Sequence, residues 1–190
     1  MKPSLHLFII CLLFCVFRIC AQIVPDFPVN SVPITALLLY AVYFCNRKGL
    51  LIASTIWFVS YPILSMLQGY PVGGDLWASL LGFAPTIGIA YALRKKGSTW
   101  LQTLLGAMGG ACAFYFLTNT CSWIVNPLYA KSLEGFTQAQ WTGHPSYSLP
   151  TWVFLRNSLV ANALFASIIG VSQLKAPITA KQSVIIKANS

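Results

Sequence analysis

The charged residues of this chain are sorted by loop along the sequence. There are 12 basic and three acidic residues, and most of them lie in short breaks between long apolar runs. Arg47–Lys48 and Arg94–Lys96 fill two of these breaks, whereas Asp26, Asp75 and Glu134 all fall in the alternate breaks. Membrane proteins show this pattern, because basic loops stay cytoplasmic while acids have little preference of side. The sorting therefore predicts a membrane topology.

The composition agrees with a membrane protein. The chain is 57% hydrophobic and only 8% charged, far below the roughly 25% charged fraction of a soluble domain. Its formal net charge of +9 is divided among short loops beside apolar runs, where orientation and anionic lipid explain it. We therefore expect the lipid bilayer as a partner and exclude nucleic acid.

Six apolar runs are predicted to cross the bilayer, at about residues 4–23, 32–45, 49–68, 75–93, 100–125 and 151–172. They predict one all-α membrane domain over residues 1–172, a six-helix bundle with both termini cytoplasmic, followed by a polar, basic cytoplasmic tail at 173–190. Nine of the 12 basic residues then lie inside and the three acids outside. The second run is only about 21 Å long as a helix, so we expect it to start earlier or to cross obliquely.

The first run has two interpretations. Lys2, an apolar stretch and the sequence Cys20-Ala21-Gln22 are compatible with a cleaved secretory signal. Arg18 argues against this, because a charge so close before a cleavage site is unusual. We favour a retained helix; cleavage leaves five spans with the same sidedness.

The six cysteines do not form a disulfide framework. They lie in or at the ends of apolar runs without a Cys-x-x-Cys pair, and we interpret them as packing residues. Cys20 and Cys121 both map near the outer face, so a disulfide between them is open but not predicted.

Two outer loops are longer than the other loops. Residues 24–31 contain two prolines, with Pro33 just beyond, which makes this loop stiff and non-helical. Residues 126–150 are rich in aromatics and turn formers, and loops of this length are often lids or binding loops. The alternative is a passive connector with a short interfacial helix at about 132–141, and both interpretations stay open.

Small residues recur four positions apart in the last two runs. This spacing lets membrane helices approach closely. We interpret it as packing within the chain, with a docking face for another membrane subunit as the alternative. The residues are Gly106, Gly110, Ala107, Ala111, Ala166 and Gly170.

Polar residues also occur within the apolar runs. Arg156 and Asn157 lie one turn into the sixth run, Thr118 and Asn119 near the outer end of the fifth, and Arg18 near the outer end of the first. An arginine at mid-bilayer costs about 2.5 kcal/mol or more, and less near the interface, so it usually faces the bundle interior, a partner or water. These residues are therefore candidates for a site in the outer half of the membrane.

Arg156 has three interpretations. It is an interfacial residue that snorkels to the headgroups, a fork that holds a carboxylate or phosphate of a ligand, or half of an ion pair with Asp26 or Asp75. The tryptophans of the outer side, Trp123 and Trp152 among them, form an interfacial belt or line a pocket for a flat ligand.

Catalysis has little support in the sequence. The three acids are scattered over three loops, and His6 and His144 lack metal-ligand spacing. There is no nucleophile elbow and no glycine-rich phosphate loop. We therefore expect no enzyme activity, no metal and no cofactor. No acid lies in the middle of a run, which also argues against a self-sufficient proton-coupled pump.

Three stretches of this chain resemble a family of small bacterial membrane proteins assigned to transport but not characterised. They are Arg18 followed by Pro28-x-Asn30-x-x-Pro33, the segment 116–123 with Thr118-Asn119 and Trp123, and the segment from Leu149-Pro150 to Arg156-Asn157. The resemblance spans about residues 18–171, and the order and spacing of the motifs agree. Val29 interrupts the Pro-Asn pair that is usual in the family.

That family is in turn similar to the substrate-binding S components of energy-coupling-factor importers, which bind vitamins and related micronutrients. The resemblance implies a six-helix protein of the bacterial inner membrane with a pocket near the outer face, closed by outer loops. It also implies a transmembrane coupling subunit driven by ATPases, on which S components dock through small residues of the first helix. Here the first run offers only Cys11-x-x-x-Cys15 for that contact.

We therefore expect a substrate-capture subunit that binds a small, vitamin-like solute at the outer face. The alternative is a non-catalytic scaffold that docks partners through its Gly/Ala helix faces. The expected contact residues from the polar and aromatic analysis are Arg156, Asn157, Asn119, Thr118, Trp123 and Trp152, and the matched motifs add Arg18 and Asn30.

Overall fold

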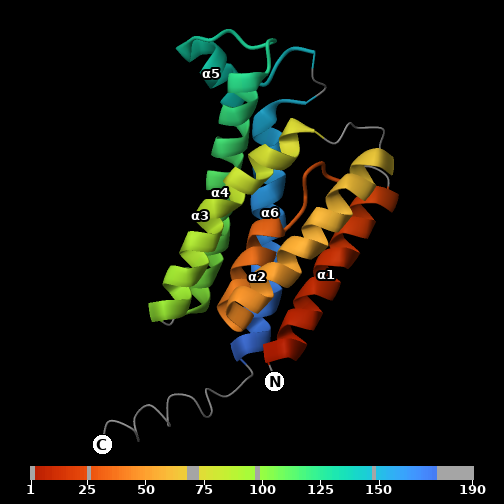
Figure 1. Cartoon of the computed structure of the whole chain (residues 1–190), viewed down its shortest axis with the longest axis vertical. Coiled ribbons are helices and arrows are strands. Elements are labelled where there is room, and N and C mark those ends of the chain that lie inside the picture. Colours follow the sequence, from red (N-terminus) through yellow and green to blue (C-terminus); the bar gives the residue numbers. More distant parts are fainter. Residues whose placement is uncertain (1–2, 25–26, 68–72, 97–98, 147–148, 175–190) are drawn as a thin grey trace, which may run out of the picture.

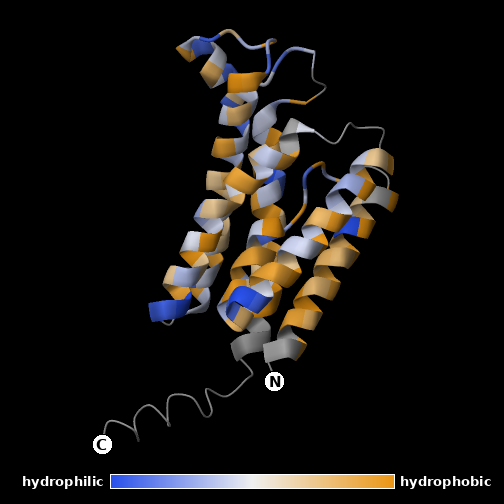
Figure 2. Cartoon of the chain, in the orientation of Figure 1, coloured by the Kyte–Doolittle hydropathy of each residue, from blue (hydrophilic) through white to orange (hydrophobic). Residues whose placement is uncertain are grey.

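The computed structural model describes residues 3–24, 27–67, 73–96, 99–146 and 149–174. Within these ranges the chain forms six helices and no strand, which confirms the all-helical prediction. Four helices are long and apolar enough to cross a membrane, and α1 contributes a shorter apolar stretch at Leu7–Ala21. The chain is therefore membrane-embedded, with apolar residues along its helices (Figure 2). The helices are α1 (Pro3–Ile23), α2 (Ile34–Leu67), α3 (Gly74–Lys96), α4 (Trp100–Val125), α5 (Leu133–Gln140) and α6 (Thr151–Leu174).

Helix α2 consists of two segments that run in opposite directions. They meet at Asn46, whose φ of 56° and ψ of −136° are not helical. The first segment (residues 34–45) runs to one end of the bundle, and the second segment (residues 47–67) returns beside α1 (Figure 1). Gly49 permits this reversal, because a Cβ there would lie only 1.8 Å from the carbonyl oxygen of Ala41. The two segments correspond to the predicted runs 32–45 and 49–68.

The first segment of α2 begins inside the bundle. It starts at Ile34, beside the middle part of α6 (Figure 1). Its 12 residues span about 18 Å, well short of the roughly 30 Å hydrocarbon core. The expectation that this run starts earlier is wrong, because the preceding backbone is not helical: Asn30 has a φ of 57° and Pro33 lacks an N–H. Residues 27–33 instead lead to Ile34 between α1 and α6, since Phe27 packs on Phe17 of α1 and Val29 is bonded to Asn157 of α6.

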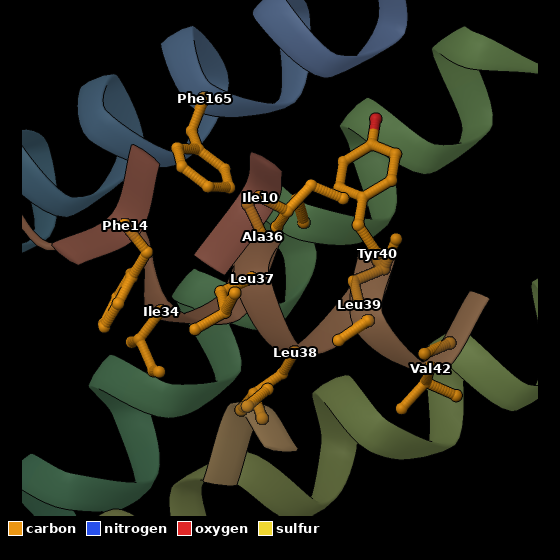
Figure 3. Close-up of a cluster of buried hydrophobic side chains, with 14 of the residues drawn as sticks. Ile10, Phe14, Ile34, Ala36, Leu37, Leu38, Leu39, Tyr40, Val42 and Phe165 are labelled. Carbon is orange, nitrogen blue, oxygen red and sulfur yellow. The ribbon is translucent and has the colours of Figure 1, made fainter. Parts of the chain in front are cut away.

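The first segment of α2 is also the centre of the core. Every residue from 34 to 42 is buried, and a helix that is apolar and buried all round belongs in the middle of a bundle. Ile10 and Phe14 of α1 and Phe165 of α6 belong to the same apolar cluster (Figure 3). The short segment therefore holds the longer helices together.

The ends of the helices follow the charge pattern. The start of α1, the reversal in α2, the end of α3 and the end of α6 lie at one end of the bundle, and α5 lies at the opposite end (Figure 1). The last turn of α3 carries Arg94, Lys95 and Lys96. We name the end with these basic residues the inner end and the end with α5 the outer end, after the predicted sidedness. Helix α6 continues to Leu174, and the rest of the predicted tail lies outside the described residues.

The small residues four apart lie mostly against other helices of the same chain. A Cβ on Gly110 would lie 2.5 Å from Thr86 Oγ1 of α3, and a Cβ on Gly170 would lie 1.7 Å from the Trp100 ring. Gly106 faces Leu39, whose Cδ1 would be 3.0 Å from an added Cβ. The buried small residues are Ala107, Gly110, Ala111, Ala166 and Gly170. This arrangement fits the packing interpretation.

The six cysteines are free thiols. Cys20 and Cys121, between which a disulfide was left open, are both partly buried and unbonded to each other. Cys11 is buried in the apolar cluster with Ile10 and Phe14, as expected of a packing residue.

Candidate ligand site at the outer end of α6

The amino end of the first segment of α2 is held by a side chain from α6. The Ala36 N–H donates to Asn162 Oδ1 at 2.8 Å, and the amide nitrogen of Asn162 donates to the Ser158 carbonyl at 2.8 Å. The Thr35 hydroxyl lies 2.8 Å from the same Asn162 oxygen and 3.0 Å from the Ala107 carbonyl, both acceptors. The first N–H groups of a helix lack partners in their own helix, and lipid offers none. Asn162 supplies one.

The carboxyl end of this segment is held by α3. The Arg94 guanidinium donates to the carbonyl of Val42 at 3.2 Å and to that of Tyr43. A cation is favourable where helix carbonyls have no partner of their own. Arg94 was predicted only as an orienting charge, so this second role is new. Because both ends are satisfied by neighbouring helices, a segment too short to span can remain inside the bundle.

The non-helical residues before Ile34 are joined to the outer part of α6. The Asn157 amide donates to the Val29 carbonyl at 2.9 Å, and the Asn30 amide donates to the Phe154 carbonyl at 3.4 Å. Arg156 Nε donates to Asn157 Oδ1 at 3.1 Å. We call Asn30, Trp152, Arg156 and Asn157 the outer cluster.

Arg156 also lies over an aromatic ring of its own helix. Its guanidinium carbon is 5.3 Å from the centroid of Trp152, within the range of a cation–π contact. The Trp152 ring stacks on Trp141 with centroids 6.5 Å apart, and the backbone N–H of Trp152 donates to the Trp141 carbonyl at 3.0 Å. The outer cluster therefore lies directly beside the end of α5.

Helix α5 lies against the outer ends of α4 and α6, and we call it the outer cap. It lies at the position of the short helix considered for residues 132–141. Gln140 Nε2 donates to Thr120 Oγ1 of α4 at 3.1 Å, and the Tyr115 hydroxyl donates to the Gln140 carbonyl. On the other side, Thr151 Oγ1 of α6 donates to the Ala139 carbonyl at 3.1 Å. The cap is thus fastened to two membrane helices.

An open groove of about 690 Å³ follows the outward face of α5. Glu134, the one acid whose side chain the structure describes, lines it together with Leu133, Thr137, Gln138, Trp141 and Thr142. Trp141 is therefore shared, since it lines the groove and stacks on Trp152 of the outer cluster.

The other predicted site residues are not part of the outer cluster. The Thr118 hydroxyl bonds the Phe114 carbonyl of its own helix at 2.9 Å, and Asn119 is partly buried on α4. Trp123 Nε1 donates to the Ala130 carbonyl at 2.9 Å and so supports the loop after α4. Lys131 Nζ lies 5.9 Å from the Trp123 ring centroid and donates to the carbonyls of Trp123 and Asn126.

Arg18 has a separate environment on α1. It lies near Tyr61 of the second segment of α2. Its Nε is buried and has no hydrogen-bond partner among the residues that the structure describes. Asp26, considered as a partner for Arg156, lies outside the described residues, as does the side chain of Asp75.

The polar contacts around the first segment of α2 were missed at the sequence level. Thr35 and Tyr40 lie within an apolar run, where nothing local distinguishes them from packing residues. The Tyr40 hydroxyl lies 3.1 Å from Thr103 Oγ1 and 3.2 Å from the Ala166 carbonyl. Asn162 carried the one usable signal, because an amide within an apolar run requires partners.

The described part of the chain contains no group of three His, Cys, Asp or Glu residues able to hold a metal ion. The fold and the outer cluster define a small helical membrane protein with a short central helix and a polar, aromatic cluster under an outer cap. The chain belongs to a family of unknown function, DUF6580, whose model matches residues 2–180. Searches of curated proteins and of solved structures give no match.

Proposed function

We propose that this protein captures a small solute at the outer end of its bundle and acts as the binding subunit of a transport system. The observation that carries the proposal is the outer cluster. Asn30, Arg156 and Asn157 bring amide and guanidinium groups together beside the stacked rings of Trp141 and Trp152. Ligand sites typically combine aromatic walls with a few oriented polar groups.

The position of this cluster in the bundle supports the same proposal. The first segment of α2 starts at Ile34, so the backbone leading to it in the outer half is irregular, with a turn at Asn30, rather than helical. Irregular backbone at membrane depth is tolerated where it is buried in protein or lines a cavity. In many transporters the substrate lies beside discontinuous helices of this kind. Residues 27–33 and α6 are therefore the proposed walls of the site, with α5 as its cap.

We extend the proposal to the cellular setting. The protein lies in the bacterial inner membrane with both termini cytoplasmic, has an S-component-like arrangement, and works with a transmembrane coupling subunit and its ATPases. The charge pattern supports the orientation, because the basic ends of the helices gather at the end opposite the cap. Neither catalysis nor a cofactor forms part of the proposal.

The scaffold alternative has less support. It requires the small residues of α4 and α6 to be free for partners, but Ala107, Gly110, Ala111, Ala166 and Gly170 are buried within the chain. Their burial leaves little of the predicted docking face available.

The capture proposal is tested by solute binding to the purified protein. Native mass spectrometry after mild detergent extraction identifies a retained solute, and the rise in melting temperature on adding that solute gives its affinity. We expect Asn30→Ala and Asn157→Ala to weaken binding about tenfold, since each removes a polar group. Lys95→Ala, at the inner end, is the control and should bind normally. Capture is rejected if neither retained nor screened metabolites bind, or if both amide variants bind like the wild type.

A further inference from the structure

Arg156 is an unusual residue for its position. It lies in the second turn of α6, a helix that is long and apolar enough to cross the membrane, where a charged side chain is costly unless it meets water, a partner or the headgroup region. Its side chain is exposed, whereas the next residue, Asn157, is 6% exposed. An accessible cation, Arg156, is therefore followed directly by a buried amide, Asn157.

Two contacts hold the Arg156 side chain in one direction. Its Nε donates to Asn157 Oδ1 at 3.1 Å, and the amide nitrogen of Asn157 is itself held by the Val29 carbonyl at 2.9 Å. Because Asn157 is fixed by residues 27–33, its oxygen is fixed toward Arg156. The Trp152 ring supports the guanidinium at 5.3 Å. An arginine oriented in this way loses less conformational entropy when it binds.

The terminal nitrogens of Arg156 remain available. Within the described part of the chain its only hydrogen bond is the one from Nε to Asn157. Glu134, the one described acidic side chain, points into the groove on the outward face of α5. A guanidinium held at Nε presents its two terminal N–H groups as a fork, and such a fork matches the paired oxygens of a carboxylate or phosphate.

We propose that Arg156 recognises an anionic oxygen group, a carboxylate or a phosphate, at the outer end of the bundle. The inference rests on the proposed function, because it assigns a chemical class to the captured solute. The same group could be carried by a free solute or by the headgroup of an anionic lipid. Asn157 and Trp152 act as positioning residues, and Arg156 makes the contact.

The test uses the full chain and matched probes. Binding of benzoate and of inorganic phosphate is measured by calorimetry in a non-ionic detergent, with benzamide as the neutral counterpart of benzoate. In parallel, the protein is placed in nanodiscs of phosphatidylcholine with and without phosphatidylglycerol, and the retained lipids are counted by native mass spectrometry. Each arm is run with the wild type, Arg156→Gln, Arg156→Lys and Lys131→Ala.

We expect an anionic probe to bind the wild type at least tenfold more tightly than benzamide. Arg156→Gln should lose that preference, and Arg156→Lys should keep only part of it, because an ammonium group cannot form the fork. Lys131→Ala removes one positive charge from the same end without touching the outer cluster, and it should bind like the wild type. Phosphatidylglycerol retained in an Arg156-dependent manner, with no binding of the soluble anions, supports the inference and assigns the group to a lipid headgroup.

Three results would overturn the inference. The first is equal binding of benzoate and benzamide, and the second is an equal loss of anion binding in Arg156→Gln and Lys131→Ala. The third is a fall in melting temperature, measured without any added anion, that is as large in Asp26→Asn as in Arg156→Gln. Asp26 would then be the group that holds the Arg156 guanidinium. A neutral solute whose binding depends on Asn157 but not on Arg156 overturns only the anion inference. Failure of every solute and lipid to bind rejects the capture proposal as well.

Discussion

Asn162 Oδ1 accepts a hydrogen bond from the backbone N–H of Ala36, a residue 126 positions earlier in the chain. The amide therefore acts as a helix cap supplied by a different helix. Both residues are completely buried, so water cannot replace the bond. The short central helix depends on this contact because its own amino-terminal N–H groups have no partner within the helix.

We predict that Asn162→Ala lowers the free energy of unfolding by about 1–3 kcal/mol, the usual cost of leaving a buried donor without an acceptor. The measurement is the midpoint of denaturant unfolding in detergent micelles. Thr35→Val should cost less, because it leaves no backbone donor unpaired.

The two substitutions should also be coupled. Thr35 and Asn162 share a contact of 2.8 Å, and effects of residues in one hydrogen-bond network do not add. The double variant should therefore differ from the sum of the single variants by at least about 0.5 kcal/mol. Strict additivity would mean that the contact is not energetically significant.

Arg94 should contribute stability that its neighbour does not. Arg94→Ala removes the donor to the Val42 and Tyr43 carbonyls, and we expect a loss of about 1 kcal/mol, as for a cation at a helix carboxyl end. Lys95→Ala changes the charge equally, and Lys95 has no hydrogen bond to lose within the part of the chain that the structure describes. The measurement is the melting temperature of each variant. Equal decreases for Arg94→Ala and Lys95→Ala would contradict the capping role of Arg94.

Two adjacent glycines of α4 should respond in opposite ways. A Cβ on Gly110 would lie 2.5 Å from Thr86 Oγ1, whereas one on Gly109 would meet nothing within 4 Å. Gly110→Ala should destabilise the protein by about 1–3 kcal/mol through overpacking. Gly109→Ala should be neutral or stabilise it by up to about 1 kcal/mol, because alanine is the better helix former. Thermal unfolding of both variants checks this contrast.

The reversal in α2 should tolerate glycine but not a β-branched residue at position 46. Asn46 has a φ of 56°, a region that costs a bulky residue about 1–3 kcal/mol. We expect Asn46→Val to lose about that much stability and Asn46→Gly to remain within about 1 kcal/mol of the wild type. The yield and melting temperature of the monomeric peak in detergent report the difference; equal behaviour of the two variants would argue against a strained turn.

Sidedness is tested by cysteine labelling in a variant whose native cysteines are replaced. Thr137→Cys, on the exposed face of α5, should react with an impermeant maleimide on intact cells. Lys48→Cys and Lys96→Cys, at the inner end, should react only after permeabilisation, since basic loops remain cytoplasmic. The reverse pattern would overturn the predicted orientation.

Much of the helical framework could be predicted from the sequence because charge and apolar length are local signals. Arg47–Lys48 and Arg94–Lys96 mark the two places where the chain turns back at the inner end. The run ending at Cys45 was predicted to cross the bilayer in spite of its short length, by an earlier start or an oblique path. The prediction did not include a helix that begins inside the bundle. Periodicity and composition describe a segment by itself, whereas the side chain that bonds the free N–H groups at its amino end lies on another helix.

The candidate site could be predicted only in part for the same reason. Arg156 and Asn157 stand out because polar residues in an apolar run require an explanation, and Asn30 was added by a motif resemblance. The spacing of Thr118 and Trp123 gave no indication that one bonds its own helix and the other supports the loop after α4. Asn162 lies five residues beyond Asn157, yet it serves the core rather than the outer cluster.

The remote cap also has a consequence for the order of assembly during synthesis. When Ala36 is added to the growing chain, Asn162, which accepts the hydrogen bond from its N–H, does not yet exist, and another 126 residues must be added to reach it. At about 5–20 residues per second this delay is roughly 6–25 s. During that interval the amino end of the central helix has to stay hydrated at the membrane surface or in the translocon. The short helix should therefore be the last element to reach its place, although it is encoded near the beginning of the chain.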